Sequence, residues 1–309
     1  MIHFPVLMDE VLHWLPSRKK GIALDSTLGG GGHAEALLKR DPDLRLIGLD
    51  KDVEAITRSH KRLKQFEDRV DLVNSGFEEL DQVLDDLEIN CVDLVIMDVG
   101  VSSFHLNEPK RGFSFSQNGL LDMRFDTSVG TNASDIIARS NERELASIFT
   151  RYGEQSQALK VAKAIIKERA KSPIKTTVQL SKIVESVLPR KRRGAIHPST
   201  KVFQALRIAV NDELDALSKG LKLAAERLCM GGRMAVISFH SLEDRIVKRT
   251  MRNLEPHCVC PKESPICVCN NPGYMKILTK KPIRPKQPEV ETNPRSRSAK
   301  LRVAERIKV

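Results

Sequence analysis

Residues 22–33, IALDSTLGGGGH, decide the fold of this 309-residue chain. The segment begins with a short apolar run that ends at Asp25, and its four glycines lead into a stretch with helical spacing of apolar residues. Glycines at such a turn let backbone N–H groups and a helix N-terminus approach a ligand closely, which Cβ atoms would prevent. Asp50 ends the next apolar run, 21 residues beyond Gly29, where dinucleotide-binding folds place an acid for the ribose hydroxyls. The order of strand, glycine turn, helix, strand and acid therefore predicts a nucleoside site in an α/β fold.

Buried strands and amphipathic helices alternate around this turn. The expected strands cover residues 22–25, 45–50, 70–73 and 91–97. The expected helices between them cover residues 34–39, 53–63 and 80–87. Because parallel strands need crossover helices to join them, this alternation predicts a doubly wound, mostly parallel sheet of the Rossmann-like kind.

The alternation stops after the fourth strand. No strand pattern occurs in residues 105–205, where the expected helices cover residues 143–150, 156–171, 177–187 and 200–210. A buried strand returns at 231–239, and residues 300–307 alternate like an edge strand. We therefore expect an all-helical domain, residues 105–205, inserted into a discontinuous sheet domain formed by residues 1–104 and 206–309.

The composition describes a globular chain whose charge is unevenly distributed. With 40% hydrophobic and 29% charged residues, the chain can bury a sizeable core in roughly two domains. Its 51 Lys and Arg exceed its 40 Asp and Glu by 11. Residues 1–104 hold 12 basic and 20 acidic side chains, a net of −8, so residues 105–309 carry +19. A basic part joined to an acidic part is typical of proteins that bind nucleic acid, although a solvated lysine-rich surface gives the same balance.

Membrane segments and disulfides are not expected. No run approaches the roughly 18 apolar residues of a membrane span, and the first residues lack the pattern of a signal peptide, so we expect a cytoplasmic protein without a membrane partner. In that setting Cys91 and Cys229, which sit in apolar runs, are expected to be reduced core residues. Four further cysteines stand at positions 258, 260, 267 and 269. Four thiolates could hold a tetrahedral zinc ion, but their single-residue spacing is tighter than that of ordinary zinc sites, so we expect no metal.

Three aspartates end predicted parallel strands. Asp25, Asp50 and Asp98 therefore lie on the carboxyl edge of the sheet, where open α/β sheets bind their ligands. Three carboxylates would repel a pyrophosphate but attract the sulfonium and ammonium groups of S-adenosylmethionine. This favours a methyl donor over a nicotinamide cofactor, although aspartates after strands also serve as helix N-caps.

Six ordered motifs resemble one family over essentially the whole chain. They are TLGGGGH at 27–33, MDVGVSS at 97–103, RGFSFSQNGLLDMRFD at 111–126, HPSTKVFQALRIAVNDEL at 197–214, ISFHSLEDRIVK at 237–248 and NPRSRSAKLRVAERI at 293–307. Together they are similar to the bacterial 16S rRNA (cytosine-N4)-methyltransferase family, RsmH or MraW. The resemblance implies a Rossmann-like class I S-adenosylmethionine-dependent methyltransferase with an inserted helical domain. Its implied reaction is methylation of the exocyclic N4 of a cytidine in the decoding centre of 16S rRNA.

The resemblance also implies which residues bind S-adenosylmethionine. The family positions correspond to Gly31, Gly32, His33, Asp50, Phe77 and Asp98. One position departs from the family, which usually has proline and glutamine after the paired serines, where this chain has Phe104 and His105. A neutral imidazole can still donate or accept one hydrogen bond, so His105 stays a candidate. Phe77 could equally be an ordinary apolar contact at the start of a helix.

Asp98 and Ser102 are the candidate catalytic residues. The lone pair of cytosine N4 is delocalised into the ring, so the enzyme must align the amine with the methyl group and accept a proton. Amino-group methyltransferases usually place an Asp-Pro-Pro-Tyr-like tetrapeptide after the fourth strand, and here Asp98 stands at its first position, followed by Val-Gly-Val. Asp98 could accept a hydrogen bond from N4 or contact the cationic donor, and Ser102 could then hold the amine.

Basic and aromatic residues of the insertion are candidates for RNA contacts. The candidates are Arg111, Phe113, Arg124, Lys191 and Arg192. The cations would bind phosphates, and Phe113 could stack on an extruded base. Residues 190–193 could instead form a solvated loop, and the alternating Phe residues of RGFSF could pack on the core. His240, Ser241 and Asp244 have the residue types of a hydrolase triad, but crowded into one turn they indicate helix capping.

Two other functions stay open at this stage: a nicotinamide-dependent oxidoreductase with a basic surface, and a non-catalytic RNA-binding or ribosome-assembly factor. The expected partner is 16S rRNA, which the resemblance places within an assembled small ribosomal subunit. The sequence leaves a homodimer open.

Overall fold

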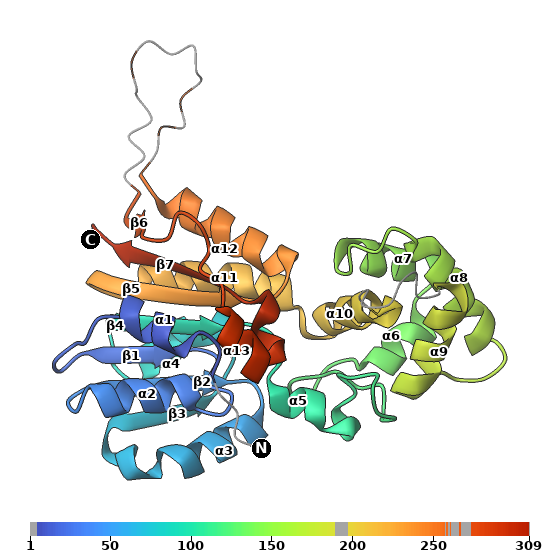
Figure 1. The fold of residues 1–309 in the computed structure, drawn as a ribbon, viewed down its shortest axis with the longest axis horizontal. Helices are drawn as coiled ribbons and strands as arrows, with labels where there is room; N and C mark the ends of the chain where they lie inside the picture. Colours follow the sequence, from blue (N-terminus) through green and yellow to red (C-terminus); the bar gives the residue numbers. More distant parts are fainter. Residues whose placement is uncertain are drawn as a thin grey trace. The chain divides into compact units, whose positions relative to one another are not determined.

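Figure 1 shows a computed structural model of the chain. It describes residues 5–188, 197–256, 258, 260, 266 and 273–308. The chain forms two compact units, residues 1–100 with 214–309 and residues 101–213. The first boundary lies four residues before the expected one. The second lies eight residues after it, because helix α10 (Pro198–Asn211) runs unbroken through residue 206.

The described residues of the first unit contain a seven-stranded sheet in the order β3-β2-β1-β4-β5-β7-β6. The strands are β1 (Ile22–Asp25), β2 (Arg45–Asp50), β3 (Val70–Asn74), β4 (Val92–Asp98), β5 (Leu228–Ser238), β6 (Met275–Ile277) and β7 (Lys300–Arg306). Strands β1 to β5 run parallel, so the predicted doubly wound parallel sheet is confirmed. Ala23 lies opposite Leu46 of β2 and Leu94 of β4, which makes β1 a central strand.

The prediction that residues 300–307 form an edge strand is wrong. Strand β7 pairs antiparallel with β5 on one side and with β6 on the other, and Glu305 lies opposite both Arg233 and Lys276. Strand β6 has three residues, and the sequence pattern predicted no strand there. A strand of three residues is too short to show an alternation of apolar and polar residues. The sequence pattern therefore predicts β7, and not β6, at the edge of the sheet.

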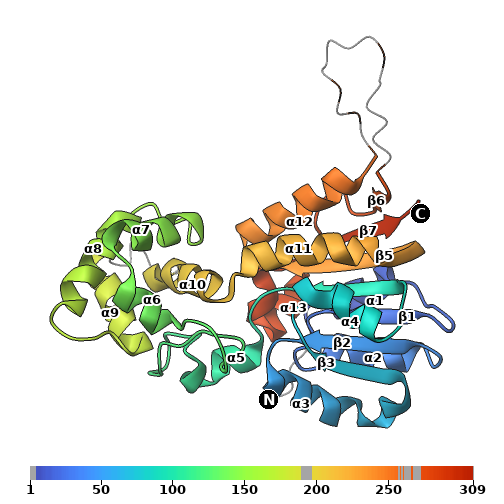
Figure 2. The ribbon, with the colours of Figure 1, turned by 180° about the vertical axis from the view of Figure 1, so that it is seen from behind.

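Helices cover both faces of the sheet. Those of the first unit are α1 (Met8–Trp14), α2 (Gly32–Arg40), α3 (Val53–Leu63), α4 (Leu80–Asp86), α11 (Glu213–Glu226), α12 (Ser241–Leu254) and α13 (Gln287–Thr292). Apolar residues of α4, α11 and α12 pack with one set of strand side chains, and those of α1, α2 and α3 with the other. Helix α2 lies in front of the sheet in Figure 1, and α4 in the opposite view of Figure 2. Among the residues described, no helix combines the length and apolar character needed to cross a bilayer.

The second unit is helical. Its helices are α5 (Ser103–Asn107), α6 (Ala133–Arg139), α7 (Glu142–Arg151), α8 (Ala158–Arg169), α9 (Thr177–Val187) and α10. The four predicted helices correspond to α7 to α10, and two capping boxes fix the starts of α7 at Asn141 and α9 at Thr176. Phe149 and Leu145 are fully buried in a core of their own, which this unit forms without the sheet.

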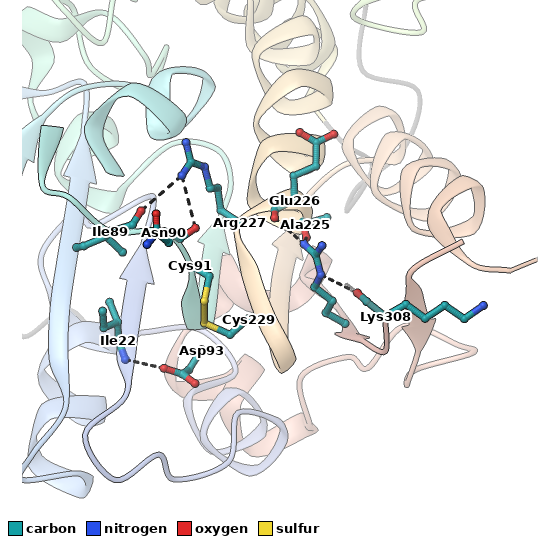
Figure 3. Close-up of a disulfide and its surroundings, with 11 residues drawn as sticks. Ile22, Ile89, Asn90, Cys91, Asp93, Ala225, Glu226, Arg227, Cys229 and Lys308 are labelled. Atoms are coloured by element: carbon teal, nitrogen blue, oxygen red, sulfur yellow. Dashed lines mark hydrogen bonds between the residues drawn. A yellow bond between two sulfur atoms is a disulfide. The ribbon is translucent and has the colours of Figure 1, made fainter. Parts of the chain in front are cut away.

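A disulfide joins Cys91 and Cys229, contrary to the expectation that both are reduced (Figure 3). The two Cα atoms are 5.1 Å apart, because β4 and β5 are neighbours and each cysteine lies at the start of one of them. Next to the disulfide, the guanidinium of Arg227 donates hydrogen bonds to the carbonyls of Ile89 and Asn90, so the segments before β4 and β5 are also joined by hydrogen bonds. The pairing could not be predicted from the sequence pattern, because the two cysteines are 138 residues apart.

Candidate functional site

The glycine turn connects β1 to α2 in a conformation that favours glycine. Gly29 and Gly31 have φ values of 53° and 69°, in the left-handed region. Helix α3 holds the turn from outside: Ser59 Oγ donates to the carbonyl of Gly29 at 3.1 Å, and Arg62 Nη1 donates to that of Gly30 at 3.0 Å. The turn is therefore built into the fold before any ligand binds.

The last glycine of the turn is required by close packing. A Cβ atom on Gly32 would lie 2.3 Å from Cγ of Pro5, so the N-terminal segment seals one side of the turn. The next residue, His33, is 6% exposed, and its Nε2 lies 3.0 Å from the carbonyl of Val6. The start of α2 is thereby fixed against the chain that precedes α1.

Asp50 ties the end of β2 to the glycine turn. Its Oδ2 accepts the N–H of Gly29 at 2.8 Å, and its Oδ1 accepts the N–H of Asp52 at 2.9 Å. Asp52, not Asp50, is the N-cap of α3, since it accepts the N–H of Glu54. Each carboxylate oxygen can accept more than one hydrogen bond, so Asp50 retains the capacity to bind ribose hydroxyls from the edge of the sheet.

Asp25 and Asp98 end neighbouring strands, β1 and β4, and Thr27 links them. Thr27 donates its N–H to Asp25 Oδ1 at 3.2 Å, and its Oγ1 accepts the N–H of Asp98 at 2.6 Å. Asp25 is 2% exposed. The Asp98 side chain is 21% exposed, but its Oδ1 is fully covered and has no hydrogen-bond partner among the residues described. His33 Nδ1 lies 3.9 Å from the other oxygen, Oδ2.

Burial and mutual repulsion hold protons on these acids. Burial, followed by the charge of Asp50, raises the pKa of Asp25 from 3.8 to about 7. Burial, followed by the charges of Asp25 and Glu243, raises the pKa of Asp98 from 3.8 to about 8. A cation bound at this edge would relieve the repulsion and favour the ionised forms. The carboxylates at this edge, among them the unsatisfied Asp98 Oδ1, and the glycine turn thus fit a cationic nucleoside such as S-adenosylmethionine.

Phe77 starts a short 3-10 helix (Phe77–Glu79) after β3, and it packs against α11. A Cβ atom on Gly220 of α11 would lie 2.5 Å from the Phe77 ring, so the ring occupies the space that this glycine leaves. The ring is half-buried at the edge of the core formed by α4, α11 and α12. The structure gives Phe77 a packing contact, and a cofactor contact from its exposed side stays a prediction.

In the second unit, His105 and Phe113 are buried together. The His105 ring lies 5.0 Å from the Phe113 ring and 5.3 Å from the Phe125 ring, between centroids, and His105 is 5% exposed. Ser102 caps α5, and its Oγ lies 3.1 Å from His105 Nδ1. Phe113 is 6% exposed and therefore packs on the core, so its ring has no open face for a base. Of the two interpretations of the RGFSF motif, core packing is the one that this burial supports. Asp98 and Ser102, the two candidate catalytic residues, belong to different units.

Arg111 and Arg124 are engaged within the second unit. Arg111 is 8% exposed, and its Nη2 donates to the carbonyls of Arg124 and Phe125. Arg124 forms a two-point ion pair with Asp122, with N–O distances of 2.9 and 2.8 Å. This pairing lowers the pKa of Asp122 and raises that of Arg124, so both stay charged and each compensates the other's charge. Both arginines thus shape the loop after α5, and their charge is less available to phosphates than the sequence suggested.

Three further sequence predictions have different outcomes. Lys191 and Arg192 lie outside the described residues, as do Cys267 and Cys269. In the part of the chain that is described, no group of three or more His, Cys, Asp or Glu side chains could hold a metal ion. The prediction of capping for residues 240–244 is confirmed, since His240 and Glu243 form a capping box at the start of α12.

Sequence reasoning missed the role of Glu243. Its side chain is 2% exposed, accepts the N–H of Phe239 at 2.7 Å, and contributes to the raised pKa of Asp98. A capping-box acid three residues after His240 was readable in the motif HSLE. Its burial beside Asp98 depends on the pairing of β4 with β5, which the sequence motif does not specify.

Comparisons with known proteins agree along the whole chain. A family model described as the MraW methylase family matches residues 1–307. A protein of Carboxydothermus hydrogenoformans named ribosomal RNA small subunit methyltransferase H is 47% identical over 305 residues, 99% of this chain and 98% of that protein. The protein of the same name in Syntrophus aciditrophicus is 46% identical over 307 residues, with the same coverage. Among solved structures, an rRNA methylase from Streptococcus thermophilus covers 100% of this chain and 99% of its own at 11% identity, with a TM-score of 0.42.

Proposed function

The chain belongs to the MraW methylase family, and we propose that it transfers a methyl group from S-adenosylmethionine to the exocyclic N4 of a cytidine in the decoding centre of 16S rRNA. Family membership fits the Rossmann-like class I methyltransferase fold of the first unit. It also removes the nicotinamide-dependent oxidoreductase from consideration. The observation that carries the proposal is the cluster of carboxylates beside the glycine turn, with the buried Asp98 Oδ1 at its centre.

The first unit supplies the groups that would hold the methyl donor. When bound, S-adenosylmethionine supplies an electrophilic methyl group on a positively charged sulfur. The turn at Gly31 and Gly32 leaves room for close approach of the backbone, and Asp50 can accept the ribose hydroxyls. Asp25 and Asp98 surround the cationic end with negative charge once they are ionised.

Asp98 is the proposed acceptor for the N4 proton. A base works best when its pKa lies near the working pH, and burial brings Asp98 into that range. The Asp98 side chain is 21% exposed, which leaves it open to an incoming amine, while its covered Oδ1 has no hydrogen-bond partner among the described residues. We also propose that Ser102 holds the amine, because an amine held in line with the methyl group lowers the barrier to transfer.

The helical unit is proposed to recognise the RNA. This assignment covers residues 105–205 of the sequence-based division, with Lys191 and Arg192 as phosphate contacts. The structural roles of Arg111, Phe113 and Arg124 make them supports of that surface rather than direct contacts. The names of the relatives refer to the ribosomal RNA of the small subunit, which supports that RNA as the substrate. We propose further that it is methylated within an assembled subunit in the cytoplasm. We include a homodimer in the proposal as the state to be measured by sedimentation.

The test is transfer of label from tritiated S-adenosylmethionine to two substrates from a strain lacking the enzyme, purified small subunits and protein-free 16S rRNA. We expect label in the subunits and little in the free RNA. Label in free RNA alone would move the proposed substrate from the subunit to an earlier species, and label in neither would contradict the proposed function.

A further inference from the structure

Helices α11 and α12 enclose a surface groove that the proposed function does not use. The groove has a volume of about 230 Å³ and lies within the first unit. Ile246 and Leu254, both half-buried, give it apolar walls. Lys222 and Arg249 stand at its rim, one on each helix, and both are exposed. We call this feature the α11–α12 groove.

The exposed side of α12 is a stripe of cations. Arg245, Lys248, Arg249 and Arg252 are all exposed, and their spacing of three and four residues places them on one face of the helix. Over seven residues at 1.5 Å each, the stripe extends for about 10 Å. Helix α11 adds Lys222 and, one turn earlier, Lys219, which is also exposed.

The acids of α11 and α12 lie away from Lys222 and Arg249, the two cations at the rim of the groove. On α12, Glu243 is buried, and Asp244 is paired with Arg302 and Lys300, whose charges lower its pKa. In the described part of the chain, neither Lys222 nor Arg249 forms an ion pair. The exposed acids of α11, Asp215 and Glu226, stand near its two ends. Like charges four residues apart, as in Lys248 and Arg252, destabilise a helix, and a polyanionic partner would offset this repulsion.

We propose that the α11–α12 groove binds the phosphate backbone of an rRNA strand, as a second RNA-binding surface outside the helical insertion. The inference rests on the proposed function, because it names a contact of the same substrate. The cations match phosphates in charge, and the apolar walls suit the sugar and base of one nucleotide better than a free phosphate ion. Helix α12 also starts three residues after β5, where Ile237 lies opposite Asp98. A strand bound along α12 therefore runs from the sheet edge that holds the candidate site.

The test variant removes one cation from each wall of the groove, Lys222→Gln with Arg249→Gln. The matched control is Lys61→Gln with Lys64→Gln, which removes two exposed cations from the α3 side of the same unit. Each protein is titrated with a labelled 16S rRNA transcript at several salt concentrations. Affinity for S-adenosylmethionine, measured by calorimetry, and thermal unfolding verify that all three proteins are folded.

Loss of two phosphate contacts predicts a drop in RNA affinity of about 10-fold at 0.15 M salt and a decrease in the salt slope of about 1.4. The control is expected to bind the transcript within about 2-fold of wild type, since α3 packs with the opposite set of strand side chains from α11 and α12. Unchanged RNA affinity of the groove variant, or an equal loss in the control, would overturn the inference. Anionic lipid vesicles serve as a second probe. If the groove variant loses binding to the vesicles but binds RNA as wild type does, the surface belongs to a membrane contact and the inference is wrong.

The two proposals fail in different ways. If wild type transfers methyl groups to rRNA but the groove variant binds and methylates as well as wild type, only the groove assignment is wrong. If wild type neither binds nor methylates rRNA, the proposed function itself is wrong.

Discussion

The raised pKa of Asp98 predicts that affinity for S-adenosylmethionine depends steeply on pH. With a pKa of about 8 in the free protein, Asp98 is half ionised at pH 8 but about 1% ionised at pH 6. The ionised form is the one that attracts a sulfonium, and apparent affinity scales with the fraction of protein in the binding-competent state. Asp98 alone should therefore raise the dissociation constant about 5-fold from pH 8 to pH 7 and about 50-fold from pH 8 to pH 6.

Calorimetric titrations at pH 6, 7 and 8 measure this effect, with S-adenosylhomocysteine as the control ligand because its sulfur is uncharged. The control should show a much smaller change over the same range. In Asp98→Asn, the amide does not ionise, and the dissociation constant for S-adenosylmethionine should vary by at most about 10-fold, the part that Asp25 contributes with its pKa of about 7. Parallel pH profiles for the two ligands, or an unchanged profile in Asp98→Asn, would refute the assignment of the cation site to this carboxylate.

Three further predictions concern stability. Asp98→Asn should raise the free energy of unfolding by about 2–4 kcal/mol at pH 8 and little at pH 4, which urea unfolding at both pH values will measure. The reason is that the pKa of Asp98 is higher in the folded protein than in the unfolded chain, so ionisation at high pH destabilises the folded state. Gly32→Ala should cost about 1–3 kcal/mol and weaken donor binding, since its Cβ would collide with Pro5, as thermal unfolding and calorimetry will report. Reduction of the Cys91–Cys229 disulfide should lower the free energy of unfolding by about 2–4 kcal/mol, measured by comparing denaturant titrations with and without reductant. An unchanged unfolding midpoint would contradict a disulfide that forms in solution.

The sequence predicted the sheet well because its central strands β1, β2 and β4 are mostly buried and its helices are amphipathic. Asp25, Asp50 and Asp98 all stand at strand ends as expected, since parallel strands place their carboxyl ends on one edge. The short strand β6 and the edge it covers could not be seen, because three residues carry no period.

The helical unit was harder to predict at the level of side chains. The charge of Arg124 made it a candidate phosphate contact. Its pairing with Asp122 depends on a local turn, in which Asp122 also accepts the backbone N–H of Arg124, and residue types alone do not predict that turn. Phe113 and His105 are near each other in the sequence, and only the tertiary fold shows that both rings are buried with Phe125. Charge and aromaticity therefore identified the right segment but not the exposure of its members.

The most direct test of the central claim is nucleoside analysis of 16S rRNA after incubation of small subunits with S-adenosylmethionine and either wild-type protein or Asp98→Asn. The account predicts N4-methylcytidine with wild type, and a loss of at least about 100-fold in rate with the variant, as expected when a general base is removed. Methylation on another atom, or full activity of Asp98→Asn, would contradict it.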